Sequence, residues 1–176
     1  MRAMKAKTYR IALTGLLGAC AVALSYLESL LPTAAFLPPG AKPGFSNLAN
    51  MFAASMLGPL PAFGIALLKA GFAALTRGGT AGLMSLCGGI FSTAIMLLLF
   101  KKDRRLGFVG IGVISAVCHN LGQLCVAAAL VGNLSVLAYL PALLLFGAVA
   151  GTLTGLVCRA VLPALRRATA SFRNNR

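Results

Sequence analysis

Long apolar segments alternate along this chain with short breaks that are polar or rich in Pro and Gly. A helix that crosses the hydrocarbon core of a bilayer needs about 20 apolar residues, and most of the segments reach that length. The apolar segments are residues 11–31, 48–75, 80–100, 106–131 and 134–162. The pattern predicts an all-α integral membrane protein with one membrane domain over residues 1–176.

The segment 48–75 contains Gly58-Pro59-Leu60-Pro61, so it is either one kinked span or two short helices. Positive charge decides, because short cytoplasmic loops collect Lys and Arg. With two helices, four basic residues near the N-terminus, four in residues 101–105 and five near the C-terminus share one side, 13 of the 16 in the chain. We therefore predict a six-helix bundle with both termini in the cytoplasm. The predicted helices are 11–31, 45–57, 60–77, 80–100, 106–131 and 134–162, followed by a basic tail at 163–176.

Composition restricts the chemistry of this domain. The chain is 59% hydrophobic and 10% charged, yet its formal net charge is +14; its mean hydropathy of +0.91 excludes a soluble nucleic-acid-binding domain. Glu28 and Asp103 are the only acids and His119 is the only histidine. The five cysteines form no CxxC pair. We expect no catalytic site, no metal site, no cofactor and no nucleic-acid partner.

Two segments leave alternatives open. Residues 2–10 are basic, and Leu17-Gly18-Ala19-Cys20 in the following apolar run is similar to a lipoprotein cleavage box, so the first helix is either a span or an export signal. The second helix, at 45–57, reaches only about 20 Å at 1.5 Å per residue. It is either part of a substrate site, where irregular backbone lines a cavity, or a short helix in a thinned bilayer.

Polar residues inside apolar helices require a partner or a function. Asn47 and Asn50 are three residues apart, and His119 and Gln123 are four apart, so each pair shares a helix face. Taken singly, His119 fits a helix-to-helix hydrogen bond and Arg77 fits a side chain that reaches the headgroups. Together these residues predict a polar pocket for a ligand with negative charge. The candidate binding residues are Glu28, Lys42, Asn47, Asn50, Lys69, Arg77, His119, Asn120 and Gln123.

Small residues recur at every fourth position on two helices, which gives each a groove for close helix packing. Gly147, Gly151 and Gly155 form one groove. Gly15, Ala19 and Ala23 form the other. Each groove serves either the fold itself or a partner membrane protein.

Several of these motifs together resemble a known bacterial membrane family, the Gx transporter or heptaprenyl diphosphate synthase component I family. The resemblance covers about residues 10–163, and its most specific motif is the His-Asn-x-Gly-Gln run. That family is in turn similar to the substrate-binding S components of energy-coupling-factor (ECF) transporters. The motifs are Tyr26-Leu27-Glu28, Pro39-Gly40-Ala41-Lys42-Pro43-Gly44, Asn47, and His119-Asn120-Leu121-Gly122-Gln123.

The resemblance implies a substrate-capture subunit in the bacterial cytoplasmic membrane, for uptake of a small anionic or vitamin-like molecule. A separate membrane coupling subunit with ATPases would energise it, and Ala19 and Ala23 would dock that partner, with Gly15 extending the groove. The alternative is a non-catalytic accessory subunit in prenyl diphosphate or quinone synthesis, since a catalytic subunit needs several carboxylates for Mg²⁺. A membrane scaffold or an unrelated transporter also stays open.

Overall fold

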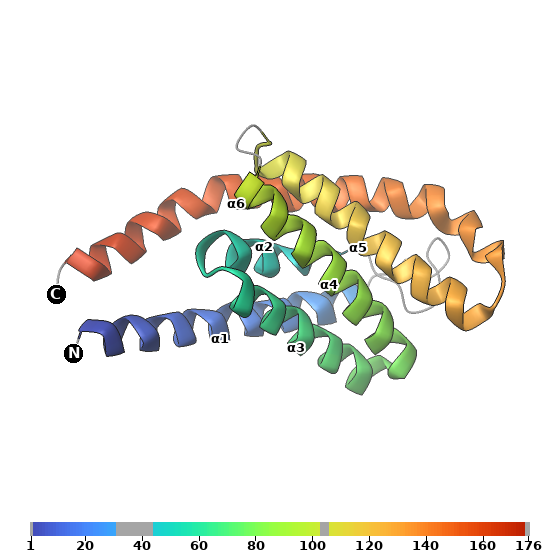
Figure 1. Cartoon of the computed structure of the whole chain (residues 1–176), viewed down its shortest axis with the longest axis horizontal. Coiled ribbons are helices and arrows are strands. Elements are labelled where there is room, and N and C mark those ends of the chain that lie inside the picture. The colour runs from blue at the N-terminus through green and yellow to red at the C-terminus, as the bar shows by residue number, and fades with distance from the viewer. Residues whose placement is uncertain (1, 31–43, 103–105, 175–176) are drawn as a thin grey trace.

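The computed structural model describes residues 2–30, 44–102 and 106–174, with side chains for residues 8–30, 44–102 and 106–167. The described residues form helices and turns and contain no strand (Figure 1). The expected six-helix, all-α fold is confirmed, and the segment 48–75 forms two helices. The elements are α1 (Arg2–Ser29), α2 (Asn47–Met56), α3 (Pro59–Arg77), α4 (Gly79–Lys102), α5 (Phe108–Val131), η1 (Leu134–Tyr139) and α6 (Leu140–Asn174).

The first and last helices, α1 and α6, are each longer than the apolar segment that predicts them. α1 begins at Arg2 rather than at residue 11, because Ala, Met, Lys and Arg are strong helix formers even where they are not apolar. α6 continues through Pro163 to Asn174, so the predicted helix end at 162 is wrong. An Ala-, Leu- and Arg-rich sequence follows Pro163 and sustains the helix. Hydropathy marks the part of a helix inside the bilayer and does not mark where the helix ends.

Glycines in the left-handed region separate successive helices. Gly58 (φ 90°) lies between α2 and α3, Gly78 (φ 91°) between α3 and α4, and Gly132 (φ 66°) after α5. These angles are strained for any residue with a Cβ. After Gly132, the Asn133 side chain accepts a hydrogen bond of 2.9 Å from the Ser135 backbone N–H and starts η1. The Gly/Pro breaks read from the sequence are therefore chain reversals.

The exterior of the bundle is apolar and its interior holds polar side chains. Leu16, Leu60 and Leu75 are 62%, 85% and 89% exposed, whereas several Asn, Ser and Thr side chains are buried. Among the described residues, five helices are long and apolar enough to cross a membrane. α2, with 10 residues, is about 15 Å long and is too short. This inversion of the usual pattern identifies a multi-pass membrane protein.

Backbones approach most closely where α5 packs against α6. A Cβ at Gly151 would lie 2.5 Å from the Gly112 carbonyl oxygen, and one at Gly155 would collide with Val109. The small-residue groove of α6 therefore serves the fold. The small-residue groove of α1 does not pack against another helix of the described bundle, since Gly15 has open space around it and Ala19 and Ala23 are exposed.

Adding a single methyl group tests this difference between the grooves. Gly151→Ala is expected to lower the free energy of unfolding by about 1–3 kcal/mol, because α5 and α6 must separate to admit the methyl. Gly15→Ala is the matched control and should be neutral or stabilising by up to about 1 kcal/mol, through helix propensity alone. The measurement is thermal or denaturant unfolding in detergent. Equal effects from the two variants would contradict the packing described.

Candidate functional site

Six buried polar side chains from four helices gather beside the turn that leads into α2. We call them the polar cluster. Each is 4% exposed or less, so these polar side chains lie inside the bundle while apolar side chains cover its exterior. Burying so many polar groups without function or partners would be costly. The polar cluster consists of Glu28 on α1, Asn47 and Asn50 on α2, Lys69 on α3, and His119 and Gln123 on α5.

The turn at Gly44 and Phe45 joins three of these helices. The Phe45 backbone N–H donates a hydrogen bond to Glu28 Oε1, which fixes the carboxylate at the start of α2. Gly44 has φ +95°, and a Cβ there would lie 3.2 Å from Asn47 Nδ2 and 3.5 Å from His119 Cδ2. The positive φ therefore favours glycine at this position, and the Asn47 and His119 side chains lie close to it.

Lys69 is the buried cation of the polar cluster. Its Nζ donates a hydrogen bond of 2.8 Å to Asn47 Oδ1, and Glu28 interacts electrostatically with it and with Arg77. One turn further along α2, Asn50 Nδ2 donates a 2.9 Å hydrogen bond to Thr93 Oγ1 on α4. The two asparagines thus connect α2 to α3 and to α4.

The His-Asn-x-Gly-Gln run of α5 makes one contact within the helix and contacts two neighbouring helices, α4 and α6. Gln123 Nε2 lies 3.1 Å from His119 Nε2, so the amide donates to the ring nitrogen and the ring proton is on Nδ1. Asn120 Nδ2 points toward α6 and donates a hydrogen bond of 2.7 Å to the Leu143 carbonyl oxygen. Gly122 packs on α4 so closely that a Cβ added at this position would lie 2.9 Å from Gly88 Cα. The four polar and glycine positions of the run therefore take part in three different contacts.

Several buried polar atoms of these residues have no hydrogen-bond partner within the described part of the chain. One of them, His119 Nδ1, lies against the backbone of Gly88, which interacts with it. Three of the others belong to the polar cluster and offer one donor and two acceptors. A small molecule with polar groups of both kinds would satisfy these three, whereas Asn120 lies outside the polar cluster. These atoms are Glu28 Oε2, Asn47 Nδ2, Asn50 Oδ1, His119 Nδ1 and Asn120 Oδ1.

The nine candidate residues of the sequence do not all converge. Six form the polar cluster. Asn120 faces α6 instead, and Arg77 lies half-buried at the end of α3, two turns beyond Lys69. Lys42 lies outside the described residues. Thr93 is not among the residues predicted from the sequence. The signal for it is that the adjacent hydroxyl residues Ser92 and Thr93 interrupt an apolar run, and both are fully buried.

The fold and the polar cluster define a multi-pass helical membrane protein with a buried polar site. The chain belongs to the heptaprenyl diphosphate synthase component I family, whose model matches residues 17–161. The expected family is thereby confirmed. Neither a curated protein nor a solved structure matches the chain.

A double-mutant cycle tests the contact between Lys69 and Asn47. Asn47→Ala leaves the buried ammonium without its acceptor and should cost about 1.5–3 kcal/mol in unfolding free energy. Lys69→Met removes the charge, so the double variant should be more stable than the sum of the single effects by about 0.5–3 kcal/mol. Thr152→Ala, whose hydroxyl bonds within α6, is the control partner and should combine additively with Lys69→Met. Additivity of Asn47→Ala and Lys69→Met would refute the contact.

Proposed function

We propose that this chain is a non-catalytic membrane subunit that binds a small polar molecule in the polar cluster. The observation that carries the proposal is the set of unpaired donor and acceptor atoms on the buried side chains of Glu28 on α1 and of Asn47 and Asn50 on α2. A structural polar network would pair its own atoms, because each unpaired buried group costs about 1–3 kcal/mol. A ligand that pairs them would recover that cost.

The family description favours a role beside a prenyl diphosphate synthase. Such an enzyme holds Mg²⁺ and diphosphate with several carboxylates. This chain has only Glu28 and Asp103, and one oxygen of Glu28 already accepts the Phe45 N–H. The chain would therefore act as the membrane component, with catalysis supplied by a separate partner subunit.

Capture of a substrate for import is the second candidate, and the position of the polar cluster favours it. The N-terminal end of α1 and the C-terminal end of α6 lie at the same end of the bundle (Figure 1). Glu28 lies in the last turn of α1, at the end away from the N-terminus, and His119 lies at the middle of α5. With both termini in the cytoplasm of a bacterial cell, as the basic residues favour, the polar cluster would extend from the outer end of α1 to the middle of the membrane, and an imported ligand would reach it from outside.

Either role needs a partner subunit, and α1 offers a surface for it. Gly15, Ala19 and Ala23 are exposed on the bundle, and small residues at this spacing allow another helix to approach closely. In the first role the partner would belong to the synthase. In the second role it would be a membrane coupling subunit with ATPases.

The accessory role predicts a gain of synthase activity. Purified protein in lipid vesicles, added to the catalytic prenyl diphosphate synthase of the same cell, should raise the rate of product formation or lengthen the product. Ala19→Leu, which fills the α1 groove, should abolish the gain, whereas Leu145→Ala on an exposed face of α6 should not. The measurement is radiolabelled isopentenyl diphosphate incorporation. An unchanged rate and product length would remove the synthase role.

The capture role predicts a retained small molecule. Mass spectrometry of protein purified from its own membranes should find a polar ligand at near-stoichiometric amount. Asn47→Ala and His119→Ala should each reduce its retention at least tenfold, because they remove groups that face the Gly44 turn. Thr152→Ala should retain it fully. Equal retention by all variants would place the molecule outside the polar cluster.

A further inference from the structure

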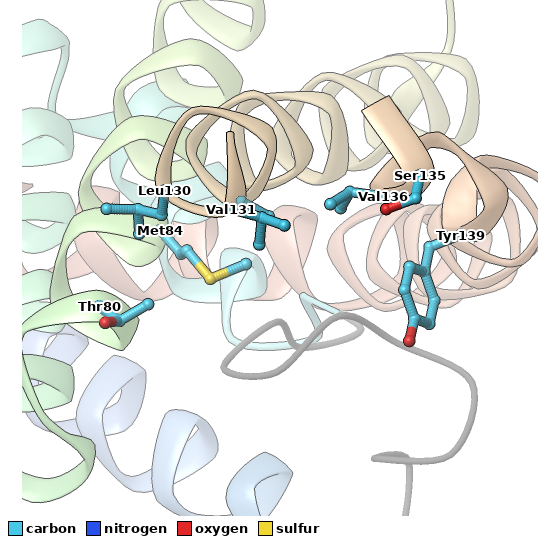
Figure 2. A pocket seen from close by; sticks show the side chains of 8 residues that line it. Thr80, Met84, Leu130, Val131, Ser135, Val136 and Tyr139 are labelled. Carbon is cyan, nitrogen blue, oxygen red and sulfur yellow. The ribbon is translucent and has the colours of Figure 1, made fainter. Parts of the chain in front are cut away.

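A second feature lies one helical turn from the polar cluster, toward η1. It is a pocket of about 300 Å³ between α4, α5 and η1. Its lining is mainly apolar, with three hydroxyl groups. In Figure 2, Thr80, Met84 and Leu130 lie on one side, Val131 in the middle, and the labelled η1 residues on the other. The lining residues are Thr80, Met84, Ala127, Leu130, Val131, Ser135, Val136 and Tyr139.

The pocket has a closed floor and an open mouth. Met84, Ala127 and Val136 are at most 6% exposed and form the floor. Leu130 and Val131, by contrast, are more than half exposed and lie at the mouth. A small molecule can therefore enter from the η1 end of the bundle and is stopped by Met84.

Helix register places the floor next to the polar cluster. Met84 is one turn before Gly88, against which the His119 ring packs, and Ala127 is one turn after Gln123. One turn of α-helix is about 5.4 Å. Met84 packs with Leu124, Ala127, Val136 and Leu143 in one buried apolar cluster, and the register places this cluster next to the His119–Gln123 pair. Met is unbranched and adaptable, so it can move aside for a ligand more readily than Ile or Val.

We propose that this pocket is the apolar half of the ligand site. It holds the body of a small amphipathic molecule, and the polar end of that molecule passes Met84 to reach Gln123 and His119. The proposal rests on the proposed function of the polar cluster and adds the class of ligand. A volume of about 300 Å³ is at the lower end of the range for ligand pockets. It suits a one- or two-ring molecule rather than a long prenyl chain.

Equilibrium dialysis of the purified full chain with 2-naphthoate, a two-ring body with one carboxylate, tests the proposal. The chain has no Trp, so the probe's fluorescence is read without tryptophan background. The native chain should bind the probe saturably, and acetate, which has the head without the body, should not compete. Val131→Phe fills the mouth and should weaken binding at least tenfold. Val149→Phe, the matched change on an exposed face of α6, should change it less than twofold.

Variants of the polar cluster separate the two proposals. If both Val131→Phe and Gln123→Leu lose 2-naphthoate binding, the pocket and the polar cluster form one continuous site. If Gln123→Leu and His119→Ala lose binding and Val131→Phe binds as the native chain does, the pocket is not part of the site and the polar cluster alone is. Loss in Val131→Phe alone overturns the shared site. Absence of saturable binding by the native chain overturns the ligand class.

A bilayer lipid is the other source of an apolar group at this position. Phosphatidylglycerol added to the detergent micelles distinguishes the two sources. Under the proposal, the lipid leaves 2-naphthoate binding unchanged. Complete displacement of the probe by the lipid would assign the pocket to an acyl chain and overturn the proposal.

Discussion

The absence of water inside a bilayer governs this structure. Every polar atom that faces the interior of the bundle must be paired within the protein or by something bound to it. Lys69 is paired by Asn47, Asn50 by Thr93, and Asn120 by a carbonyl of α6. Each of these asparagines still has one buried atom unpaired. Under the proposed function, the unpaired atoms of Asn47 and Asn50 mark the place where the ligand binds.

Two sets of helices meet at the polar cluster. α4, α5 and α6 are joined by glycine contacts such as Gly88 with Gly122 and Gly112 with Gly151, where backbones touch. α3 also packs closely on α4, where a Cβ at Gly82 would lie 2.6 Å from the Ala74 Cβ. α1, α2 and α3 reach the cluster through polar contacts as well, namely Phe45 with Glu28 and Lys69 with Asn47. The close-packed half therefore presents His119 and Gln123 at fixed positions, and the other half supplies the groups that are joined to them through the Gly44 turn.

The sequence predicts the helices better than it predicts their contacts. Runs of apolar residues separated by Gly58, Gly78 and Gly132 give the order of the helices, because both hydropathy and backbone freedom are local, and the placement of the basic residues decides that the segment with Gly58 forms two helices. The direction of Asn120 is not local: it shares a motif with His119 yet bonds to α6. The partnership of Thr93 with Asn50 joins residues 43 positions apart. Spacing fixes which side chains share a face and leaves open what that face meets.

The distribution of charge bears on both candidate functions. Of the basic residues whose side chains are described, Lys69 is the buried one, and the acid it interacts with is Glu28. Together they carry no net charge, and the half-buried Arg77 adds one positive charge. A diphosphate would bring several negative charges into this interior, where uncompensated charge is costly. A role in prenyl diphosphate synthesis is therefore better explained by contact with a partner along α1 than by binding of the diphosphate itself. The polar cluster then suits a ligand with at most one negative charge in either role.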